Sequence, residues 1–332
     1  MTSVAILGSG FMGATHASAY RALAGRVRVT SVCSQSVESA AAIAEQLGAR
    51  ATTDLDEAIV DPYVDAVDIC LPTGLHREAA ERAFAAGKHV LLEKPIALTL
   101  DDADAILAAA ERSGRILMVG LVLRFWTEYV ELERRLSAGE LGRPLGLSAY
   151  RLSQPPDWSD WIADAERSGG VPVDLMIHDF DQANWLLGRP RSVVARGDRT
   201  RHVHAVVEYD DASAVIEGSL AMPASYPFTS GIRVACERGV AEYAFSAAPA
   251  EGGGNIGPAA SASGLRLFPT GGDALVLDRP QVDPWHAEIA AFLDCLEQGR
   301  PPEQGTGEQA RLALAVSLAA SRSLETGRAE PV

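Results

Sequence analysis

The chain has 332 residues, of which 47% are apolar and 22% are charged, and its 29 basic and 44 acidic residues give a formal net charge of −15. This length suggests two domains, since one domain usually holds about 150 residues. The negative charge argues against nucleic acid and anionic membrane surfaces as partners, because both are polyanions. We therefore expect a globular protein whose partner is a small molecule.

The N-terminus and the cysteines indicate the compartment. The chain enters the strand-like run Val4–Leu7 without the basic and apolar regions of a signal peptide. No apolar run approaches the roughly 18 residues of a membrane span. The four cysteines are far apart and form no Cys-x-x-Cys pair, which predicts buried thiols and neither a disulfide framework nor a zinc site. We expect a cytoplasmic protein with no membrane partner.

Up to residue 123, short apolar runs alternate with alanine-rich helical stretches such as Glu38–Leu47 and Arg77–Ala86. The apolar runs are Val4–Leu7, Val27–Cys33, Ala66–Leu71, His89–Glu93 and Ile116–Leu123. Strands that are apolar on both faces and separated by helices predict a parallel sheet covered on both sides. This is the doubly wound α/β architecture.

After Leu123 the pattern changes to strands that follow one another without helices, which predicts antiparallel pairing. The stretch Glu251–Gly264 is rich in Gly, Ala and Ser and predicts a mobile loop. The expected elements are helices over Tyr129–Leu136, Asp174–Leu187, Trp285–Leu296 and Glu308–Leu324, and strands over Leu145–Leu152, His202–Tyr209 and Ala214–Ala221. Residues 124–332 are therefore expected to form an α+β domain with helices on one side of its sheet.

A glycine motif, Gly8-Ser9-Gly10-Phe11-Met12-Gly13, follows the first strand and opens a helix. In a dinucleotide-binding motif Gly8 allows the tight turn, Gly10 lets the backbone approach a pyrophosphate, and Gly13 lets the helix lie close to the strand. The helix N-terminus offers free N–H groups to the phosphates. The alternative is a purely structural turn, but the flanking strand, helix and βαβ units favour a dinucleotide site.

The residue about 20 positions further on separates NAD from NADP. An acid there binds the ribose hydroxyls of NAD, whereas a small residue with a nearby Arg admits the 2′-phosphate of NADP. Here Ser34 stands between Cys33 and Gln35, so both the acid and the Arg are missing. We expect NAD or NADP, with a slight lean to NADP. Alternatively, Ser34 only caps the following helix.

Glu93-Lys94-Pro95 lies at the end of the fourth predicted strand, at the edge where open α/β sheets bind ligands. Only two of the 29 basic residues are lysines, Lys88 and Lys94. In a chain that uses Arg almost everywhere, a lysine is expected where a compact, titratable cation is needed. Lys94 is therefore a candidate to hydrogen-bond a substrate oxygen. The alternative is an ordinary surface lysine.

Asp174 and His178 are four residues apart on a predicted helix and so share one face. A carboxylate one turn from an imidazole can orient the ring for acid–base work or hold a substrate hydroxyl. The alternative is a solvated helix face. The preceding Gly169-Gly170 pair and the loop with Trp158 and Trp161 favour a site, because aromatic side chains can form a wall for a sugar ring.

Other histidines are weaker candidates. His202 and His204 alternate on a strand and could face one ligand, but no third ligand is evident, so we expect no metal site. His76 follows the third predicted strand and could reach a cofactor edge, although packing or capping would explain it equally well.

Over nearly its whole length the chain resembles the glucose–fructose oxidoreductase / inositol dehydrogenase / MocA (Gfo/Idh/MocA) family. The segments that carry the resemblance are Gly8–Gly13, Leu71–His76, Glu93-Lys94-Pro95, Arg124-Phe125-Trp126, Gly169-Gly170, Asp174–Asp179 and Pro284–Glu288. The resemblance implies an NAD(P)-binding Rossmann domain over residues 1–123 and, over residues 124–332, a substrate-binding domain built on an open antiparallel sheet. It also implies a homodimer or homotetramer formed through that sheet.

The same resemblance implies roles for individual residues. Lys94, Asp174 and His178 match the catalytic residues of the family: His178 takes the proton of a substrate hydroxyl, Lys94 polarises that oxygen and Asp174 orients the substrate or His178. The implied cofactor-binding residues are Gly8, Gly10, Phe11, Met12, Gly13, Ser34, Leu71, Pro72, Thr73, His76, Glu93 and Lys94. The implied substrate-binding residues are Lys94, Arg124, Trp158, Trp161, Asp174 and His178.

The expected function is that of an NAD(P)-dependent dehydrogenase or reductase. It would transfer hydride between the nicotinamide and a carbinol or ketone of a sugar, inositol or related polyol. Two alternatives remain open: a cofactor-binding regulator without enzymatic activity, and a glycosidase of the same fold that retains NAD.

Overall fold

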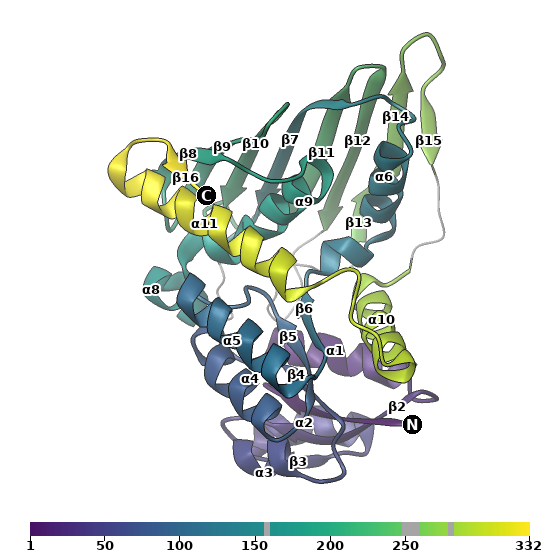
Figure 1. The fold of residues 1–332 in the computed structure, drawn as a ribbon, viewed down its shortest axis with the longest axis vertical. Helices are drawn as coiled ribbons and strands as arrows, with labels where there is room; N and C mark the ends of the chain where they lie inside the picture. Colours follow the sequence, from purple (N-terminus) through teal and green to yellow (C-terminus); the bar gives the residue numbers. More distant parts are fainter. Residues whose placement is uncertain (156–159, 248–258, 278–281) are drawn as a thin grey trace. The chain divides into compact units, whose positions relative to one another are not determined.

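The structure is a computed structural model that describes residues 1–155, 160–247, 259–277 and 282–332. The chain forms two compact units (Figure 1). The first unit comprises Met1–Trp126 and Val282–Arg311, and the second comprises Thr127–Gln281 and Leu312–Val332. Among the described helices none is both long and apolar enough to span a membrane.

The first unit contains a parallel six-stranded sheet, counted over the described residues. Its strands are β1 (Thr2–Leu7), β2 (Val27–Cys33), β3 (Arg50–Thr52), β4 (Ala66–Ile69), β5 (His89–Glu93) and β6 (Leu117–Gly120). Their order is β3-β2-β1-β4-β5-β6, so the strand order reverses between β1 and β4. This confirms the doubly wound prediction, and such a reversal is where open α/β sheets bind ligands.

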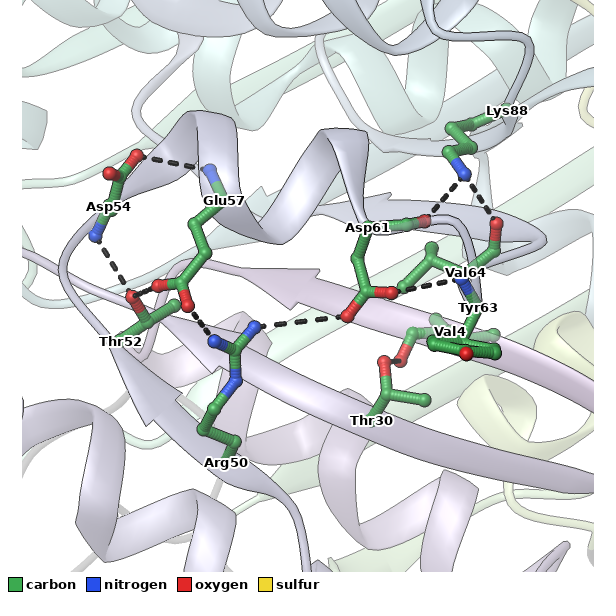
Figure 2. A network of polar contacts seen from close by, with 10 residues as sticks. All are labelled: Val4, Thr30, Arg50, Thr52, Asp54, Glu57, Asp61, Tyr63, Val64 and Lys88. Carbon is green, nitrogen blue, oxygen red and sulfur yellow. Dashed lines mark hydrogen bonds and ion pairs between the residues drawn. The ribbon is translucent and has the colours of Figure 1, made fainter.

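Strand β3 was not predicted, so Glu93 ends the fifth strand and not the fourth. β3 has only three residues at the edge of the sheet, too few for a hydrophobic pattern. Polar contacts hold it in place: Glu57 accepts hydrogen bonds from Arg50 and from the Thr52 hydroxyl, and Asp54 caps helix α3 (Leu55–Val60) (Figure 2).

The remaining helices of the first unit cover the sheet. They are α1 (Phe11–Ala22), α2 (Val37–Leu47), α4 (His76–Ala85), α5 (Leu100–Ser113) and α10 (Pro284–Gln298), with 3-10 turns over Thr73–Leu75 and Val122–Phe125. Although α10 is distant in sequence, Ile289, Phe292 and Leu293 are fully buried in the same apolar cluster as Tyr20 of α1. The division into a cofactor-binding domain over residues 1–123 and a substrate-binding domain over residues 124–332 stays a prediction. By packing, α10 belongs to the first unit.

Lys88 has a structural role in the first unit. Its side chain is buried, and its Nζ donates hydrogen bonds of 2.7 Å to the carbonyl oxygens of Asp61 and Val64 (Figure 2). The compact ammonium group fits between two carbonyls on a short turn, a place where a planar guanidinium would need more room. One of the two lysines of the chain is therefore explained by packing.

The second unit is built on a ten-stranded sheet, again counted over the described residues. Its strands are β7 (Pro144–Leu152), β8 (Ser192–Asp198), β9 (His202–Glu208), β10 (Ser213–Ser219), β11 (Phe228–Cys236), β12 (Gly239–Ala247), β13 (Ala259–Ala262), β14 (Leu265–Pro269), β15 (Leu275–Leu277) and β16 (Glu330–Pro331). The order is β15-β14-β12-β11-β7-β10-β9-β8-β16, with β13 beside β12. The pairing is antiparallel, as predicted, except that β7 and β10 run parallel.

Helices lie against one face of this sheet, as predicted (Figure 1). They are α6 (Thr127–Ser137), α9 (Ile177–Leu187) and the part of α11 (Gly307–Thr326) from Leu312 onward. The unit also contains the short helices α7 (Asp160–Ala163) and α8 (Ala165–Ser168), which pack against each other. On β9 the covered face buries Val203, Ala205 and Val207, while His204 and Val206 are exposed. We call this second, exposed side the open face.

Two predicted elements differ from the structure. Asp174–Leu187 is not one helix, because a π-helical turn over Val171–Leu175 precedes α9. The stretch Glu251–Gly264 is not a loop throughout: residues 251–258 lie outside the described residues, but β13 pairs with β12. Low side-chain volume hides such a strand from a hydrophobic pattern.

A buried ion pair fastens α9 to the sheet. Arg151 of β7 donates two hydrogen bonds, 2.8 Å and 3.0 Å long, to the two carboxylate oxygens of Asp179 in α9. Both side chains are almost fully buried. Such a pair is costly to break from one side, because the remaining charge stays in a medium that solvates it poorly.

Asp179→Ala should therefore lower the free energy of unfolding by about 3–5 kcal/mol, because it leaves the Arg151 guanidinium buried and unpaired. The measurement is denaturant unfolding of the full chain. As a control, Glu237→Ala removes the partner of Arg143 in an exposed ion pair of the same unit, and it should shift the unfolding midpoint little. Equal effects of the two variants would contradict a fastening role for the buried pair.

Candidate functional site

The glycine motif packs as a dinucleotide-binding turn requires. Gly8 has φ +111°, and a Cβ there would lie 2.3 Å from the carbonyl oxygen of Cys70. A Cβ on Gly13 would lie 2.1 Å from the carbonyl oxygen of Gly8. Gly8 and Gly13 are therefore required because the backbone packs closely around them. These two of the three glycines in the motif are explained without a bound ligand.

Gly10 has no such structural reason. Among the described residues nothing lies within 4 Å of a Cβ built on it, and its φ is −71°. It is the N-cap of α1, yet no side chain caps the helix there. The space above Gly10 and the N–H groups of the first turn of α1 fit a pyrophosphate, which a Cβ would keep away.

Ser34 lies beside the glycine motif. Its hydroxyl is 2.6 Å from the hydroxyl of Ser9, so the end of β2 is tied to the turn after β1. The alternative that Ser34 caps the following helix is wrong, because Ser36 is the N-cap of α2 and accepts a hydrogen bond from the Ser39 N–H. Ser34 is thus free of a capping role and stands where the ribose end of a dinucleotide is read.

The segment Leu71–His76 is tied to the turn after β5. His76 is buried, and its two ring nitrogens lie 2.8 Å from the carbonyl oxygen of Leu71 and 3.0 Å from that of Pro95. Burial lowers the pKa of His76, so the ring is neutral and can donate its single proton to either carbonyl. Pro72 and Thr73 lie within the segment that this ring holds, and His76 acts on it by positioning.

Lys94 follows β5 directly. Its backbone N–H donates a 2.9 Å hydrogen bond to the carboxylate of Glu93, which is buried. The Glu93 side chain therefore fixes the main chain at Lys94, while the lysine side chain is half-buried. That Glu93 contacts a cofactor stays a prediction.

A buried polar cluster lies behind Glu93 in the first unit. His16 of α1 is fully buried, with Nδ1 2.8 Å from Asp68 of β4 and Nε2 3.2 Å from Glu93. Burial acts to lower the pKa of His16, but the charges of Asp68 and Cys70 and the hydrogen bonds to both side chains together outweigh it and raise that pKa well above its ordinary value. We call these residues, together with Glu288 of α10, the buried polar cluster.

Glu288 is the least compensated member of the cluster. Its carboxyl group is fully buried, and neither oxygen has a hydrogen-bond partner among the described residues. One carboxylate oxygen of Glu288, one ring nitrogen of His16 and one carboxylate oxygen of Glu93 all lie within 4.8 Å of one another. Burial, and next the charge of Glu93, raise the pKa of Glu288 well above its ordinary value and so favour the protonated form of this carboxyl.

Asp174 and His178 belong to the second unit. Within Val171–Phe180 these are the two side chains that are partly exposed, whereas the others in this described segment are buried. Asp174 lies in the π-helical turn and His178 in the first turn of α9. π-helical turns occur frequently at functional sites, because they re-aim side chains that a regular helix would place elsewhere.

The two preceding glycines allow this turn. Gly169 and Gly170 have φ +83° and +73°, and a Cβ on Gly170 would lie 2.6 Å from the carbonyl oxygen of Arg199. The same carbonyl accepts a 2.8 Å hydrogen bond from the Val171 N–H. The pair thus forms a tightly packed reversal of the chain.

The remaining predicted substrate residues are less informative. Arg124 is buried and donates a 2.7 Å hydrogen bond to Gln304, within the first unit. Trp161 lies half-buried in the short helix α7. Trp158 lies outside the described residues. The predicted site residues thus gather within each unit: the glycine motif with Ser34 and Lys94 in the first, Asp174 and His178 in the second.

Sequence reasoning missed the buried polar cluster and the Arg151–Asp179 pair. One signal was present: Asp68 interrupts the apolar run Ala66–Ile69, and a carboxylate inside a buried strand needs a partner. Nothing in the spacing identifies His16 or Glu288 as members, because α1 and α10 meet only through tertiary packing.

Gly10→Ala should leave the fold intact and weaken binding of NADH or NADPH by at least about tenfold, because the new Cβ fills space that only a pyrophosphate would use. Fluorescence titration of the nucleotide and thermal unfolding without it give the two readouts. Gly25→Ala is the matched control, since nothing lies within 4 Å of its Cβ either and it is remote from the motif in sequence. Unchanged nucleotide binding in Gly10→Ala would contradict the assignment.

Glu288→Gln should make the protein less sensitive to rising pH. In the native state the pKa of Glu288 is raised above its unfolded value of about 4.5, so its contribution is complete below pH 4.5 and is lost as pH rises toward the native pKa. The neutral amide removes this loss. The stability of the variant relative to the parent should therefore rise by up to about 1.4 kcal/mol per pH unit above pH 5.

Urea unfolding of both proteins at several pH values between 4 and 8 measures this difference. At pH 4 the Glu288 carboxyl is mostly neutral in both the native and the unfolded state. The difference in stability at that pH therefore mainly reports the replacement of a carboxylic acid by an amide of the same shape. A difference that stays constant over the whole range would mean that Glu288 is ionised in the native protein.

Comparisons with known proteins identify the family of the chain. The profile described as "Oxidoreductase family, NAD-binding Rossmann fold" matches residues 2–121, and the profile described as "GFO/IDH/MocA C-terminal domain" matches residues 129–242. These two matches cover both the glycine motif and the segment with Asp174 and His178.

Individual relatives carry the same assignment. The scyllo-inositol 2-dehydrogenase (NAD(+)) of Bacillus subtilis is 30% identical over 64% of this chain and 61% of that protein. The D-xylose 1-dehydrogenase (NADP(+)) 2 of Haloferax volcanii is 30% identical over 90% of each chain. The solved structure of an aldose-aldose oxidoreductase from Caulobacter crescentus, complexed with glycerol, has a TM-score of 0.85 at 25% identity and covers 100% of this chain and 99% of that one. The chain therefore belongs to the GFO/IDH/MocA family of oxidoreductases with an NAD-binding Rossmann fold.

Proposed function

We propose that this enzyme transfers hydride between NAD or NADP and a carbinol or ketone carbon of a sugar, inositol or related polyol. The relatives named above act on an inositol and on a pentose, which supports this substrate class. The observation that carries the proposal is the exposure of Asp174 and His178 in an otherwise buried segment. A carboxylate and an imidazole presented together are the groups that move a hydroxyl proton.

We assign the chemistry to Lys94, Asp174 and His178. His178 accepts the proton of the substrate hydroxyl during oxidation and returns it during reduction. Lys94 donates a hydrogen bond to the same oxygen and favours its negatively charged form. Asp174 orients the substrate or the His178 ring. The bound nicotinamide supplies the hydride acceptor or donor.

The glycine motif would hold the pyrophosphate, with the backbone of Gly10 and the first turn of α1 as donors. Ser34 supports a slight preference for NADP, because no acid stands at the end of β2 to favour the ribose hydroxyls of NAD. Leu71, Pro72, Thr73 and His76 would line the same edge of the sheet. Arg124, Trp158 and Trp161 remain proposed substrate contacts.

We also propose that the enzyme is a homodimer or homotetramer formed through the open face of the second unit. Val206 and Val215 are opposite each other in neighbouring strands and are both exposed on that face. Exposed β-branched residues on a broad sheet are suited to burial against a second copy. The four free cysteines support a cytoplasmic location, where thiols stay reduced.

Lys94→Ala and His178→Ala should each lower kcat by about 10²–10⁴-fold. The first removes the cation that stabilises negative charge on the substrate oxygen, and the second removes the group that accepts the hydroxyl proton. Binding of NADH or NADPH, measured by fluorescence titration, should stay unchanged. Lys88→Met is the control: it removes the other lysine and its two carbonyl contacts, and so should lower stability but not the turnover of the folded enzyme. Full activity in both site variants would contradict the assignment.

The activity itself is tested by titration with NADH and NADPH, followed by absorbance of the nicotinamide with a panel of inositols, aldoses and keto-sugars. Turnover with one nucleotide identifies both the cofactor and the substrate class. Tight nucleotide binding without turnover on any compound would favour a regulator. Release of free sugar from a glycoside with no net absorbance change would favour an NAD-retaining glycosidase.

A further inference from the structure

Three metal-ligating side chains meet on the open face of the second unit: His202 and His204 of β9 and Glu217 of β10. The sequence shows only the two histidines as a pair. The third residue comes from strand register, because Glu217 lies directly opposite His204 in the antiparallel β9–β10 pair. Residues opposite each other in such a pair project from the same face, and so does the residue two positions along. We call the three residues the His–His–Glu cluster.

The ligand atoms of the cluster are close together. Nε2 of His202 lies 3.2 Å from Nε2 of His204 and 3.1 Å from Oε1 of Glu217, and all three ligand atoms lie within 4.8 Å of one another. Two ligands that are each about 2.1 Å from one metal ion are separated by about 3.0 Å at a right angle and about 3.4 Å at a tetrahedral angle. The two separations from His202 Nε2 fall in this range.

The cluster is exposed in the single chain and partly preorganised. The side chains of His202 and Glu217 are 39% and 35% exposed there, so an ion can enter from the open face; in an oligomer formed through that face, the ion would lie at the interface between copies. The imidazole rings are 4.8 Å apart between centroids and tilted by 50°, with the Nε2 atoms turned toward each other. Without an ion, one N–H of His202 faces two acceptors, Nε2 of His204 and Oε1 of Glu217, and can donate a full hydrogen bond to only one of them.

Charges around the cluster also favour a cation. Asp198 of β8 is opposite His202 and adds a second carboxylate on the same face. Arg196 is opposite His204 and opposes a cation, but its guanidinium is held by the carbonyl oxygens of Ala195 and Gly327 at 2.7 Å and 2.8 Å. Asp198 is itself held by hydrogen bonds from the backbone N–H and the hydroxyl of Thr200 and interacts with the charge of Arg201. The charge that most directly favours a cation is therefore that of Glu217, 3.1 Å from His202 Nε2.

We propose that the His–His–Glu cluster binds one divalent transition-metal ion of the zinc class. Two imidazole nitrogens and one carboxylate oxygen are ligands typical of zinc, whereas magnesium and calcium prefer oxygen ligands alone. The bound ion bridges β9 and β10 at the end where β9 begins. It stabilises the native state through mass action, since the three ligands are brought together only in the folded sheet.

Isothermal titration of the tag-free, chelator-treated full chain with ZnCl2 tests the proposal. We expect one Zn²⁺ per chain. His204→Ala and Glu217→Gln should each weaken this binding by at least about tenfold, because each removes one of three protein ligands. His286→Ala is the matched control: it removes another partly exposed histidine, located in the first unit, and should leave Zn²⁺ binding unchanged.

Spectroscopy with Co²⁺ separates this cluster from the cysteines. Co²⁺ bound by nitrogen and oxygen gives visible bands without an intense thiolate charge-transfer band, and the bands should disappear in Glu217→Gln and in His204→Ala. A thiolate band would place the ion at a cysteine and overturn the proposal. Absence of Zn²⁺ binding, or equal binding by the parent and both cluster variants, would overturn it as well.

Discussion

The first unit depends on one close contact between backbones. Because Gly8 and Gly13 have no Cβ, α1 can lie directly against the ends of β1 and β4. This approach places His16, less than one turn after Gly13, beneath the sheet and against Asp68 and Glu93. Glu93 in turn holds the main chain at Lys94. The position of Lys94, the proposed catalytic lysine, therefore depends on Gly8 and Gly13 having no Cβ. The connection runs through the contact of His16 with Glu93 and the hydrogen bond from Lys94 to Glu93.

In the second unit, the polar side chains proposed for the site lie beside buried core residues of the same segment. Asp174 lies in a π-helical turn, entered through Gly169 and Gly170, and His178 in the first turn of α9, and both side chains are partly exposed. The neighbouring Asp179 points into the core and is neutralised by Arg151 of β7. Consecutive residues of one segment thus differ: His178 is partly exposed, and Asp179 fastens the segment to the sheet.

Local patterns were enough to predict much of this molecule. The parallel sheet, the glycine motif and the strands around His202 follow from periodicity and spacing, which are properties of short segments. What could not be predicted depends on partners distant in sequence. The short edge strand β3 is held by polar contacts, β7 and β10 pair in parallel, and α10 joins α1 across about 270 residues. Glu288 and Glu217 were missed for this reason: each matters only beside a histidine that tertiary packing or strand register brings to it.

The return of α10 to the first unit also bears on how the chain is made. Ile289, Phe292 and Leu293 cover the apolar side of α1 near Tyr20, yet they are synthesised after strands β7 to β15 of the second-unit sheet. Until then, a growing chain presents that side of α1 to solvent and to chaperones. The nucleotide-binding unit, although nearly all of it lies at the N-terminus, therefore completes its core only after nine-tenths of the chain, up to Gln298 of 332 residues, has left the ribosome.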